Sequence, residues 1–267
     1  MKKLIQIAIC AAIEAGKAII EIYNTGFDIE LKEDNSPLTT ADKKAHKIIS
    51  EYLIDTGIPI LSEEGKQLAY EERKQWHQFW LVDPLDGTKE FIKKNGEFTV
   101  NIAFIEDGKT VAGVIYVPVT DILYVGLKNK GAFKLDDTSG FDGSVDQLIK
   151  TAAKLPENKA DDEYIVVASR SHLNSETALF LEKSKKIHPN IKIVSKGSSL
   201  KLCLVAEGKA DVYPRFAPTM EWDIAAGHAI VNASGGQVLL AEDEKTELKY
   251  NKENLLNPWF IAERRRY

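Results

Sequence analysis

The sequence predicts a chain of two halves, the first of the α+β class and the second of the α/β class. In the first half, helical patterns are followed by short strand patterns that are joined by reverse turns. In the second half, strand and helix patterns alternate. Between them, residues 136–163 are polar and lack periodicity. We therefore expect an N-terminal unit at 1–150 and a C-terminal unit at 151–267.

The first half opens with helices. Residues 3–23 place apolar side chains at helical spacing and end before Asn24-Thr25-Gly26, which predicts a long helix that faces the core. A second helical pattern follows Leu38-Thr39-Thr40-Ala41-Asp42. Asp42 falls in its first turn, where the helix dipole favours a carboxylate, so a purely structural role is open for this residue.

The rest of the first half reads mainly as strands. The pattern predicts a strand at 58–61, a helix at about 69–76, a strand at 80–83, and four further strands at 98–105, 110–117, 121–125 and 132–135. Turn-forming residues occupy the joints between the last four strands. This arrangement is typical of an antiparallel meander.

The second half predicts a sheet flanked by helices. The expected elements are strands at 164–168, 191–194, 211–213 and 237–240, and helices at 175–186, 199–207 and 223–233. The last predicted helix begins at Asp223, where a helix N-cap is expected.

Composition narrows the class of protein. The chain has 267 residues, of which 44% are hydrophobic and 28% charged, as in ordinary globular proteins. The net charge of −5 argues against binding of polymeric nucleic acid. Cys10 and Cys203 lie in apolar helical patterns, which indicates packed thiols and a reducing compartment.

We also expect no integral membrane segment, because no apolar run is long enough. The expected location is the cytoplasm. Peripheral attachment to the inner face of the membrane stays open, although Arg264-Arg265-Arg266 is too short to indicate it. The sequence does not indicate an oligomeric state.

The stretch Asp83-Pro84-Leu85-Asp86-Gly87-Thr88 follows an apolar strand pattern. Pro84 has no N–H group, so we expect the strand to stop there, and Gly87 permits a sharp turn. Two carboxylates and the Leu85 carbonyl would then offer oxygen ligands of the kind that Mg²⁺ prefers. A helix at 88–92 would point its positive end at a phosphate. The alternative is that both acids are turn and N-cap residues.

Three motifs taken together resemble those of the inositol monophosphatase superfamily, the Mg²⁺-dependent, lithium-sensitive phosphatases. They are Leu61-Ser62-Glu63-Glu64-Gly65, the stretch from Trp80 to Thr88, and Glu221-Trp222-Asp223-Ile224-Ala225-Ala226-Gly227. The resemblance implies a layered α-β-α-β-α sandwich of the inositol monophosphatase and fructose-bisphosphatase type.

Other stretches are similar to those of the 3′(2′),5′-bisphosphate nucleotidases of the CysQ type, which act in sulfur metabolism. They are Lys89-Glu90-Phe91, Ser169-Arg170-Ser171-His172, Gly197-Ser198-Ser199-Leu200-Lys201 and the run from Tyr213 to Thr219. The resemblance implies a small-molecule substrate, adenosine 3′,5′-bisphosphate, that is hydrolysed to AMP and phosphate.

The same resemblance assigns the site residues. The metal ligands, for two or three Mg²⁺, would be Glu63, Asp83, the Leu85 carbonyl, Asp86 and Asp223. The catalytic residues would be Glu63, Thr88 and Asp42, with Thr88 donating to Asp42 and orienting the attacking water. The substrate-binding residues would be Glu63, Leu85, Asp86, Gly87, Thr88, Ser198, Lys201, Arg215 and Asp223.

Several alternatives remain open. Lys201 is equally consistent with a solvated helix residue, and His172 with either a nucleotide contact or a surface position. The enzyme could instead be an inositol monophosphatase or another small phosphate-monoester phosphatase. A non-catalytic metal- or nucleotide-binding protein is the third hypothesis, which the complete set of acids argues against.

Overall fold

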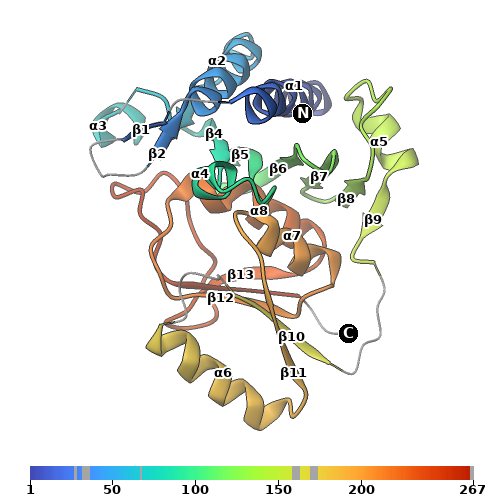
Figure 1. Cartoon of the computed structure of the whole chain (residues 1–267). Helices are drawn as coiled ribbons and strands as arrows, with labels where there is room; N and C mark the ends of the chain where they lie inside the picture. Colours follow the sequence, from blue (N-terminus) through green and yellow to red (C-terminus); the bar gives the residue numbers. More distant parts are fainter. Residues whose placement is uncertain (27–28, 32–36, 67, 158–162, 169–173, 265–267) are drawn as a thin grey trace.

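The computed structural model describes residues 1–26, 29–31, 37–66, 68–157, 163–168 and 174–264. Its helices and sheets stack in the order α-β-α-β-α (Figure 1). Helices α1 (Lys2–Thr25) and α2 (Thr40–Ile54) cover one face of a seven-stranded sheet, and α7 (Leu200–Glu207) and α8 (Glu221–Ala233) cover the other. A five-stranded sheet follows, and α6 (Ser175–Ile187) lies on its outer face. The predicted layered sandwich is therefore confirmed.

The seven-stranded sheet has its strands in chain order. They are β3 (Ile60–Ser62), β4 (Gln78–Asp86), β5 (Thr99–Glu106), β6 (Lys109–Val117), β7 (Ile122–Leu127), β8 (Gly131–Leu135) and β9 (Ala153–Leu155). β3 runs parallel to β4, and every later pair is antiparallel, so the predicted meander is confirmed.

Residues 136–163 were expected to be irregular, but they include α5 (Val145–Thr151) and β9. A three-residue strand shows no periodicity of its own, and its pairing with β8 makes it a strand. The first sheet thus ends at residue 155, and the division into two units at residue 150 stays a prediction.

The path of β4 corrects one expectation. We predicted that this strand stops at Asp83, but it continues to Asp86. Its pairing with β5 shifts register between these two acids, which is the mark of a β-bulge. Pro84 lies in the bulge, where the ladder needs no N–H group, and the Leu85 N–H group donates to Asp83 Oδ1 at 3.1 Å. Both acids therefore project from one irregular strand end.

The five-stranded sheet has the order β11-β10-β12-β14-β13. Its strands are β10 (Tyr164–Ala168), β11 (Ile191–Ser195), β12 (Val212–Arg215), β13 (Gln237–Leu240) and β14 (Phe260–Glu263). The sequence analysis missed β14, which lies between β12 and β13 and is antiparallel to both. Its four residues follow a loop without periodicity, so only its neighbours identify it as a strand.

Four smaller elements complete the described chain: β1 (Ile29–Leu31), β2 (Pro37–Thr39), α3 (Tyr70–Arg73) and α4 (Thr88–Ile92). The helix expected at 69–76 is only four residues long, whereas the helix expected at 88–92 is present as predicted. Both cysteines are unpaired, Cys203 being buried and Cys10 partly so, as expected for packed thiols. Every helix of the described chain is too short or too polar to cross a membrane.

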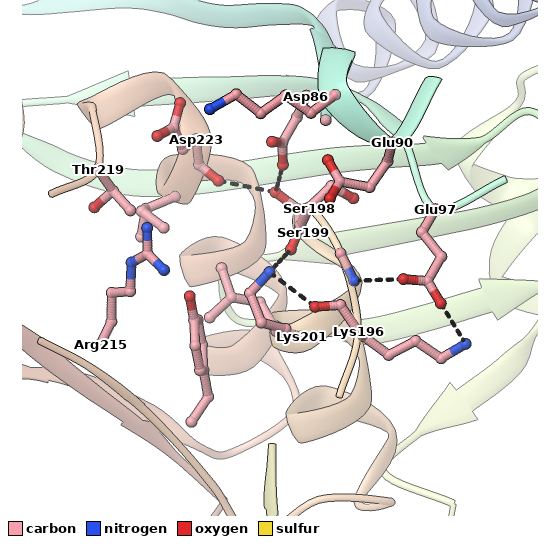
Figure 2. Close-up of a pocket in the computed structure, with 16 residues that line it drawn as sticks. Asp86, Glu90, Glu97, Lys196, Ser198, Ser199, Lys201, Arg215, Thr219 and Asp223 are labelled. Carbon is pink, nitrogen blue, oxygen red and sulfur yellow. Dashed lines mark hydrogen bonds and ion pairs between the residues drawn. The ribbon is translucent and has the colours of Figure 1, made fainter. Parts of the chain in front are cut away.

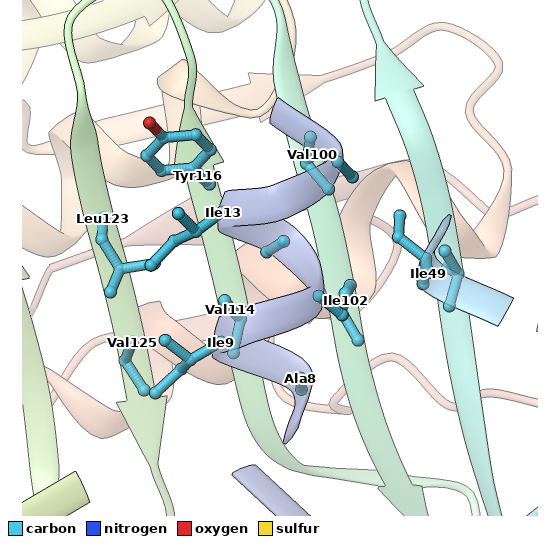
Figure 3. Packing of buried hydrophobic residues seen from close by; sticks show 14 of the residues in the cluster. Ala8, Ile9, Ile13, Ile49, Val100, Ile102, Val114, Tyr116, Leu123 and Val125 are labelled. Carbon is cyan, nitrogen blue, oxygen red and sulfur yellow. The ribbon is translucent and has the colours of Figure 1, made fainter. Parts of the chain in front are cut away.

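The central sheet is buried on both faces. Along β4, Trp80 and Val82 pack with α1 and α2, while Phe79 and Leu81 pack with α7 and α8. Successive side chains of a β-strand point to opposite faces of the sheet, which explains this alternation. Figure 3 shows side chains of α1 lying over those of β5, β6 and β7.

Helix α8 lies directly on the central sheet because two glycines leave room for it. A Cβ atom added to Gly113 would lie 2.2 Å from the Ala226 carbonyl oxygen, and one added to Gly126 would lie 2.5 Å from the Ile230 Cα atom. A larger residue at either position would push the helix away. This contact fixes α8, which carries Asp223, against the sheet that carries Asp83.

Candidate metal and phosphate site

Three carboxylates from distant parts of the chain meet at one end of the central sheet. Glu63 follows β3, Asp83 lies on β4, and Asp223 lies in the first turn of α8. One oxygen atom from each lies within 4.8 Å of the others. Asp83 is 1% exposed, and the other two side chains are half-buried. Three of the four acids that sequence analysis grouped thus meet, whereas Asp86 lies near Asp83 but outside this group of oxygen atoms.

The electrostatics of this cluster fit a bound cation. Burial raises the pKa of Asp83 well above its usual value, and the negative charges of Glu63, Asp86 and Asp223 raise it further. Burial and the charge of Asp86 also raise the pKa of Asp223. Several charged carboxylates in so small a volume repel one another unless a cation lies between them. Because all the donors are oxygen atoms, the set fits a hard divalent ion such as Mg²⁺.

Asp86 is held in place by two polar side chains. Its Oδ2 atom accepts hydrogen bonds from Ser199 Oγ at 2.7 Å and from Asn101 Nδ2 at 3.3 Å. Ser199 Oγ also lies 2.8 Å from the Asp223 carbonyl oxygen, and Asn101 Nδ2 donates to Ser199 Oγ at 2.9 Å. Ser199 and Asn101 therefore connect two of the acids.

Sequence analysis gave no site role to Asn101 and included Ser199 only as part of the motif Gly197-Ser198-Ser199-Leu200-Lys201. Asn101 offered a signal, since it interrupts the apolar run from Val100 to Ile105 in β5, where it is 1% exposed. A buried amide side chain needs hydrogen-bond partners, and here the site provides them.

Asp223 also caps its own helix. Its Oδ2 atom accepts a hydrogen bond from the Met220 N–H group at 2.8 Å. The sequence placed Asp223 at the N-cap, but the helix begins at Glu221 with Met220 as its N-cap, and Asp223 is the third helical residue. A carboxylate can accept at both oxygens, so capping is compatible with ligation.

Asp42 and Thr88 form a hydrogen-bonded pair, as the resemblance implied. Thr88 Oγ1 donates to Asp42 Oδ1 at 3.2 Å and lies 3.4 Å from the Leu85 carbonyl oxygen. Asp42 is 2% exposed, and its other oxygen accepts from the Thr39 N–H group at 2.7 Å and from Thr39 Oγ1 at 2.5 Å. Burial raises the pKa of Asp42, and these hydrogen bonds oppose the rise.

A cavity of about 220 Å³ lies beside Asp86 and Asp223 (Figure 2). Four cationic side chains line it, namely Lys89, Lys196, Lys201 and Arg215. Lys201 is 7% exposed, and its Nζ atom donates to the Ser198 carbonyl oxygen at 2.6 Å. Burial lowers the pKa of Lys201 to about 8. The reading of Lys201 as a solvated helix residue is therefore wrong.

Glu97 shapes the opposite wall of this cavity. It accepts hydrogen bonds from the Gly197 N–H group at 2.8 Å and from Lys196 Nζ at 3.2 Å. Gly197 has no room for a side chain, because an added Cβ atom would lie 2.8 Å from Glu90 Cγ. Sequence analysis did not single out Glu97, which lies 100 residues away from Gly197 along the chain.

Comparisons with known proteins identify the family. The family model described as "Inositol monophosphatase family" matches residues 1–265. The chain belongs to the inositol monophosphatase family.

Its relatives within the family include bisphosphate nucleotidases. The chain is 46% identical to the 3′(2′),5′-bisphosphate nucleotidase CysQ of Salmonella typhimurium over 251 residues, which are 92% of this chain and 94% of the relative. The identity to the protein of the same name from Escherichia coli K12 is 44%, with the same coverage of both chains.

Among solved structures, the match to CysQ from Bacteroides thetaiotaomicron has a TM-score of 0.91 and 51% identity and covers 100% of this chain and 99% of that one. The match to the extragenic suppressor protein suhB of Bartonella henselae has a TM-score of 0.74 and 26% identity and covers 98% and 94% of the two chains. The predicted family and its CysQ-type resemblance are confirmed.

The predicted substrate-binding residues of this chain fall into two groups. Those that line the cavity are Asp86, Gly87, Ser198, Lys201, Arg215 and Asp223. Glu63, Leu85 and Thr88 lie outside its lining and belong to the acid cluster and its neighbours. His172, together with the motif at 169–172, lies outside the described residues.

Proposed function

We propose that this chain is a Mg²⁺-dependent 3′(2′),5′-bisphosphate nucleotidase that converts adenosine 3′,5′-bisphosphate to AMP and phosphate. The proposal depends on one observation: Glu63, Asp83 and Asp223 lie together beside a cavity whose lining includes the cationic side chains of Lys201 and Arg215. The similarity to nucleotidases named CysQ supports this choice of substrate.

The acid cluster is the part of the site that would hold the metal. Glu63, Asp83, the Leu85 carbonyl, Asp86 and Asp223 would hold two or three Mg²⁺ ions. When bound, Mg²⁺ supplies charge neutralisation for the phosphate and makes water more acidic. Asn101 and Ser199 both donate to the Oδ2 atom of Asp86, so Oδ1 is the oxygen that this carboxylate would offer to an ion.

Thr88 is the residue that would orient the attacking water. Its hydroxyl hydrogen points at Asp42, so its oxygen lone pairs are available to accept a hydrogen from that water. Asp42 is held by Thr39 and cannot turn away. Glu63 would help to take the proton of that water.

The cavity would bind the second phosphate of the substrate. Lys201 and Arg215 offer positive charge, and the turn at Ser198 faces the same space. A phosphomonoester substrate with a second phosphate would contact both cations, whereas a substrate with one phosphate would leave them without an anion. This difference supports a bisphosphate nucleotide over an inositol monophosphate.

A phosphate-release panel tests the proposed function. The purified chain, with Mg²⁺, should release phosphate from adenosine 3′,5′-bisphosphate faster than from inositol 1-phosphate, and both EDTA and Li⁺ should reduce the rate. Faster release from the inositol ester would establish the alternative phosphatase. Calorimetric binding of the nucleotide with no release at saturating Mg²⁺ would establish a binding protein.

Lys201 should make the activity depend on pH. Its pKa of about 8 means that it carries its charge at pH 7 and loses it as the pH rises through 8. We expect Lys201→Met to lower kcat/KM for the bisphosphate about 10- to 100-fold at pH 7, since a hydrogen bond to a charged group contributes about 1.5–3 kcal/mol. The ratio of wild-type to variant kcat/KM should fall between pH 7 and pH 9.

A matched control separates this effect from general charge loss. Lys192 is exposed on β11, with its ammonium 3.4 Å from Glu163. Lys192→Met should leave kcat/KM and its pH profile unchanged. If the ratio of wild-type to Lys201→Met kcat/KM stays constant between pH 7 and pH 9, the charge of Lys201 does not contribute to substrate binding.

A further inference from the structure

The start of α8 is enclosed by the chain segment 251–257. Glu221, the first residue of the helix, is 0% exposed. Its carboxylate accepts hydrogen bonds from the Asn251 N–H group at 2.7 Å, from the Lys252 N–H group at 3.0 Å and from Lys252 Nζ at 2.6 Å. Its own N–H group donates to the Leu255 carbonyl oxygen at 2.9 Å. A fully buried carboxylate with three donors holds its neighbours firmly, because releasing any of them would leave the charge poorly paired.

Arg73 ties the same segment to the first half of the protein. It lies at the end of α3 and is 2% exposed. Its Nη1 atom donates to Asn251 Oδ1 at 2.8 Å and to the Lys252 carbonyl oxygen at 2.7 Å, and its Nη2 atom donates to the Glu253 carbonyl oxygen at 2.9 Å. Asn251 Nδ2 returns a hydrogen bond to the Arg73 carbonyl oxygen at 2.8 Å. Three acceptors at these positions suit the planar fork of a guanidinium.

These contacts form a bridge between two of the acids. Glu63 precedes α3 in the chain, and Asp223 lies two residues after Glu221. Glu63 is also held to β4, because its N–H group donates to the Val82 carbonyl oxygen at 3.1 Å. Beside Glu63 lies an open hollow whose lining includes Glu63, Arg73, Trp222 and Glu253. On this side of the site, α3 and the start of α8 are joined through segment 251–253.

We infer that Arg73 and Glu221 are positioning residues that, together with the central sheet, hold Glu63 and Asp223 at their separation, and thereby raise the affinity of the site for its divalent ion. This inference rests on the proposed function, since it takes these acids as metal ligands. Neither residue needs to touch the metal or the substrate. The effect is expected in metal affinity rather than in the chemical step, because the catalytic pair Asp42 and Thr88 lies outside the bridge.

The test uses one substitution at each residue. Arg73→Lys keeps the positive charge but can satisfy fewer of the three acceptors, and Glu221→Gln keeps the shape of the side chain but removes the charge that pairs with Lys252. Each variant should weaken Mn²⁺ binding about 10- to 100-fold, the usual cost of losing a residue that orients a metal ligand. Mn²⁺ binding is measured on the substrate-free protein by electron paramagnetic resonance, and the Mg²⁺ dependence of phosphate release is measured in parallel. At saturating Mg²⁺ the metal site is filled in every variant. Because the substitutions leave the chemical step itself unchanged, kcat should return to within about threefold of wild type.

Arg264 provides the matched control. Its Nε atom donates to Asp211 Oδ1 at 2.8 Å, and its Nη1 atom donates to the Gly208 carbonyl oxygen at 3.1 Å. Asp211 is 3% exposed, so Arg264 also forms a buried, forked contact. This contact lies next to the first residue of β12, at the opposite end of that strand from Arg215. Arg264→Lys should lower the melting temperature as Arg73→Lys does, and it should leave Mn²⁺ affinity unchanged.

Two outcomes are decisive against the inference. If the wild type binds Mn²⁺ and releases phosphate, and both Arg73→Lys and Glu221→Gln bind Mn²⁺ as tightly as the wild type, the bridge has only a structural role. If the wild type itself neither binds Mn²⁺ nor releases phosphate, the proposed function fails and the inference fails with it. Should Arg73→Lys not fold, the result for Glu221→Gln, which keeps the shape of the side chain, decides alone.

Discussion

Replacing Asp83 by asparagine is expected to lower kcat for phosphate release by about three orders of magnitude. Loss of one metal-binding carboxylate removes several kcal/mol of charge stabilisation in the transition state, and about 4 kcal/mol corresponds to a factor of about 1,000. The fold should persist, because asparagine retains an oxygen that can accept the hydrogen bond from the Leu85 N–H group. The measurement is steady-state phosphate release at saturating Mg²⁺ and nucleotide.

The same substitution should raise stability in the absence of metal. Asp83 is buried among the charges of Glu63, Asp86 and Asp223, and the neutral amide removes this repulsion. A gain of about 1 kcal/mol would raise the melting temperature by about 2–4 °C in a domain of this size. Opposite effects on activity and stability are typical of a residue held for function rather than for folding.

Asp211→Asn is the contrasting control, because this buried acid has a partner of opposite charge, Arg264, at 2.7 Å. The substitution should lower the melting temperature in EDTA and leave the Mg²⁺ dependence of phosphate release unchanged. A lower metal-free melting temperature for Asp83→Asn, together with near-normal turnover, would contradict the assignment of Asp83 as a metal ligand.

Replacing Asp42 by asparagine is expected to lower kcat by about two to three orders of magnitude, within the range for loss of a positioned proton-transfer partner. The physical reason is a reversal of one hydrogen bond. The two Thr39 donors require an oxygen at their side of residue 42, so an asparagine must turn its NH₂ group toward Thr88. The Thr88 hydroxyl would then accept from residue 42 instead of donating to it, so one of its two lone pairs would be occupied and its hydrogen would be free to turn toward the attacking water.

Two changes at Thr88 serve as controls for Asp42. Thr88→Ala should cost as much as Asp42→Asn, and Thr88→Ser, which keeps the hydroxyl, should stay within about tenfold of wild type. Because the two residues would act as a unit, the double variant Asp42→Asn with Thr88→Ala should be no slower than the slower single variant. Additive losses would show that Asp42 and Thr88 act independently.

Local patterns were sufficient to predict much of the fold. The long first helix, the four-strand meander and the helix that starts near Asp223 each depend on the spacing of nearby apolar residues and on turn-forming residues between them. Such spacing is a property of neighbouring positions, so it can be seen without the fold. The extent of β4 was different, because the bulge that admits Pro84 exists through the pairing of this strand with β5.

The acids of the site were also visible in the sequence, because each stands in a motif that resembles one of a known family. The residues that hold them were not. Asn101 and Ser199 are 98 residues apart, and Arg73 and Asn251 are 178 residues apart. Neither pair has any local pattern that would indicate contact.

The sequence by itself therefore determined the longer helices and strands, the family resemblance and the candidate carboxylates, since these follow from residue type and short-range order. The tertiary structure decided that the carboxylates lie within one ion's reach, that Lys201 is buried beside them, and that segment 251–257 encloses the start of α8. The physical reason is that burial and long-range hydrogen bonds arise only when layers of the sandwich pack together, and no single stretch of chain carries that information.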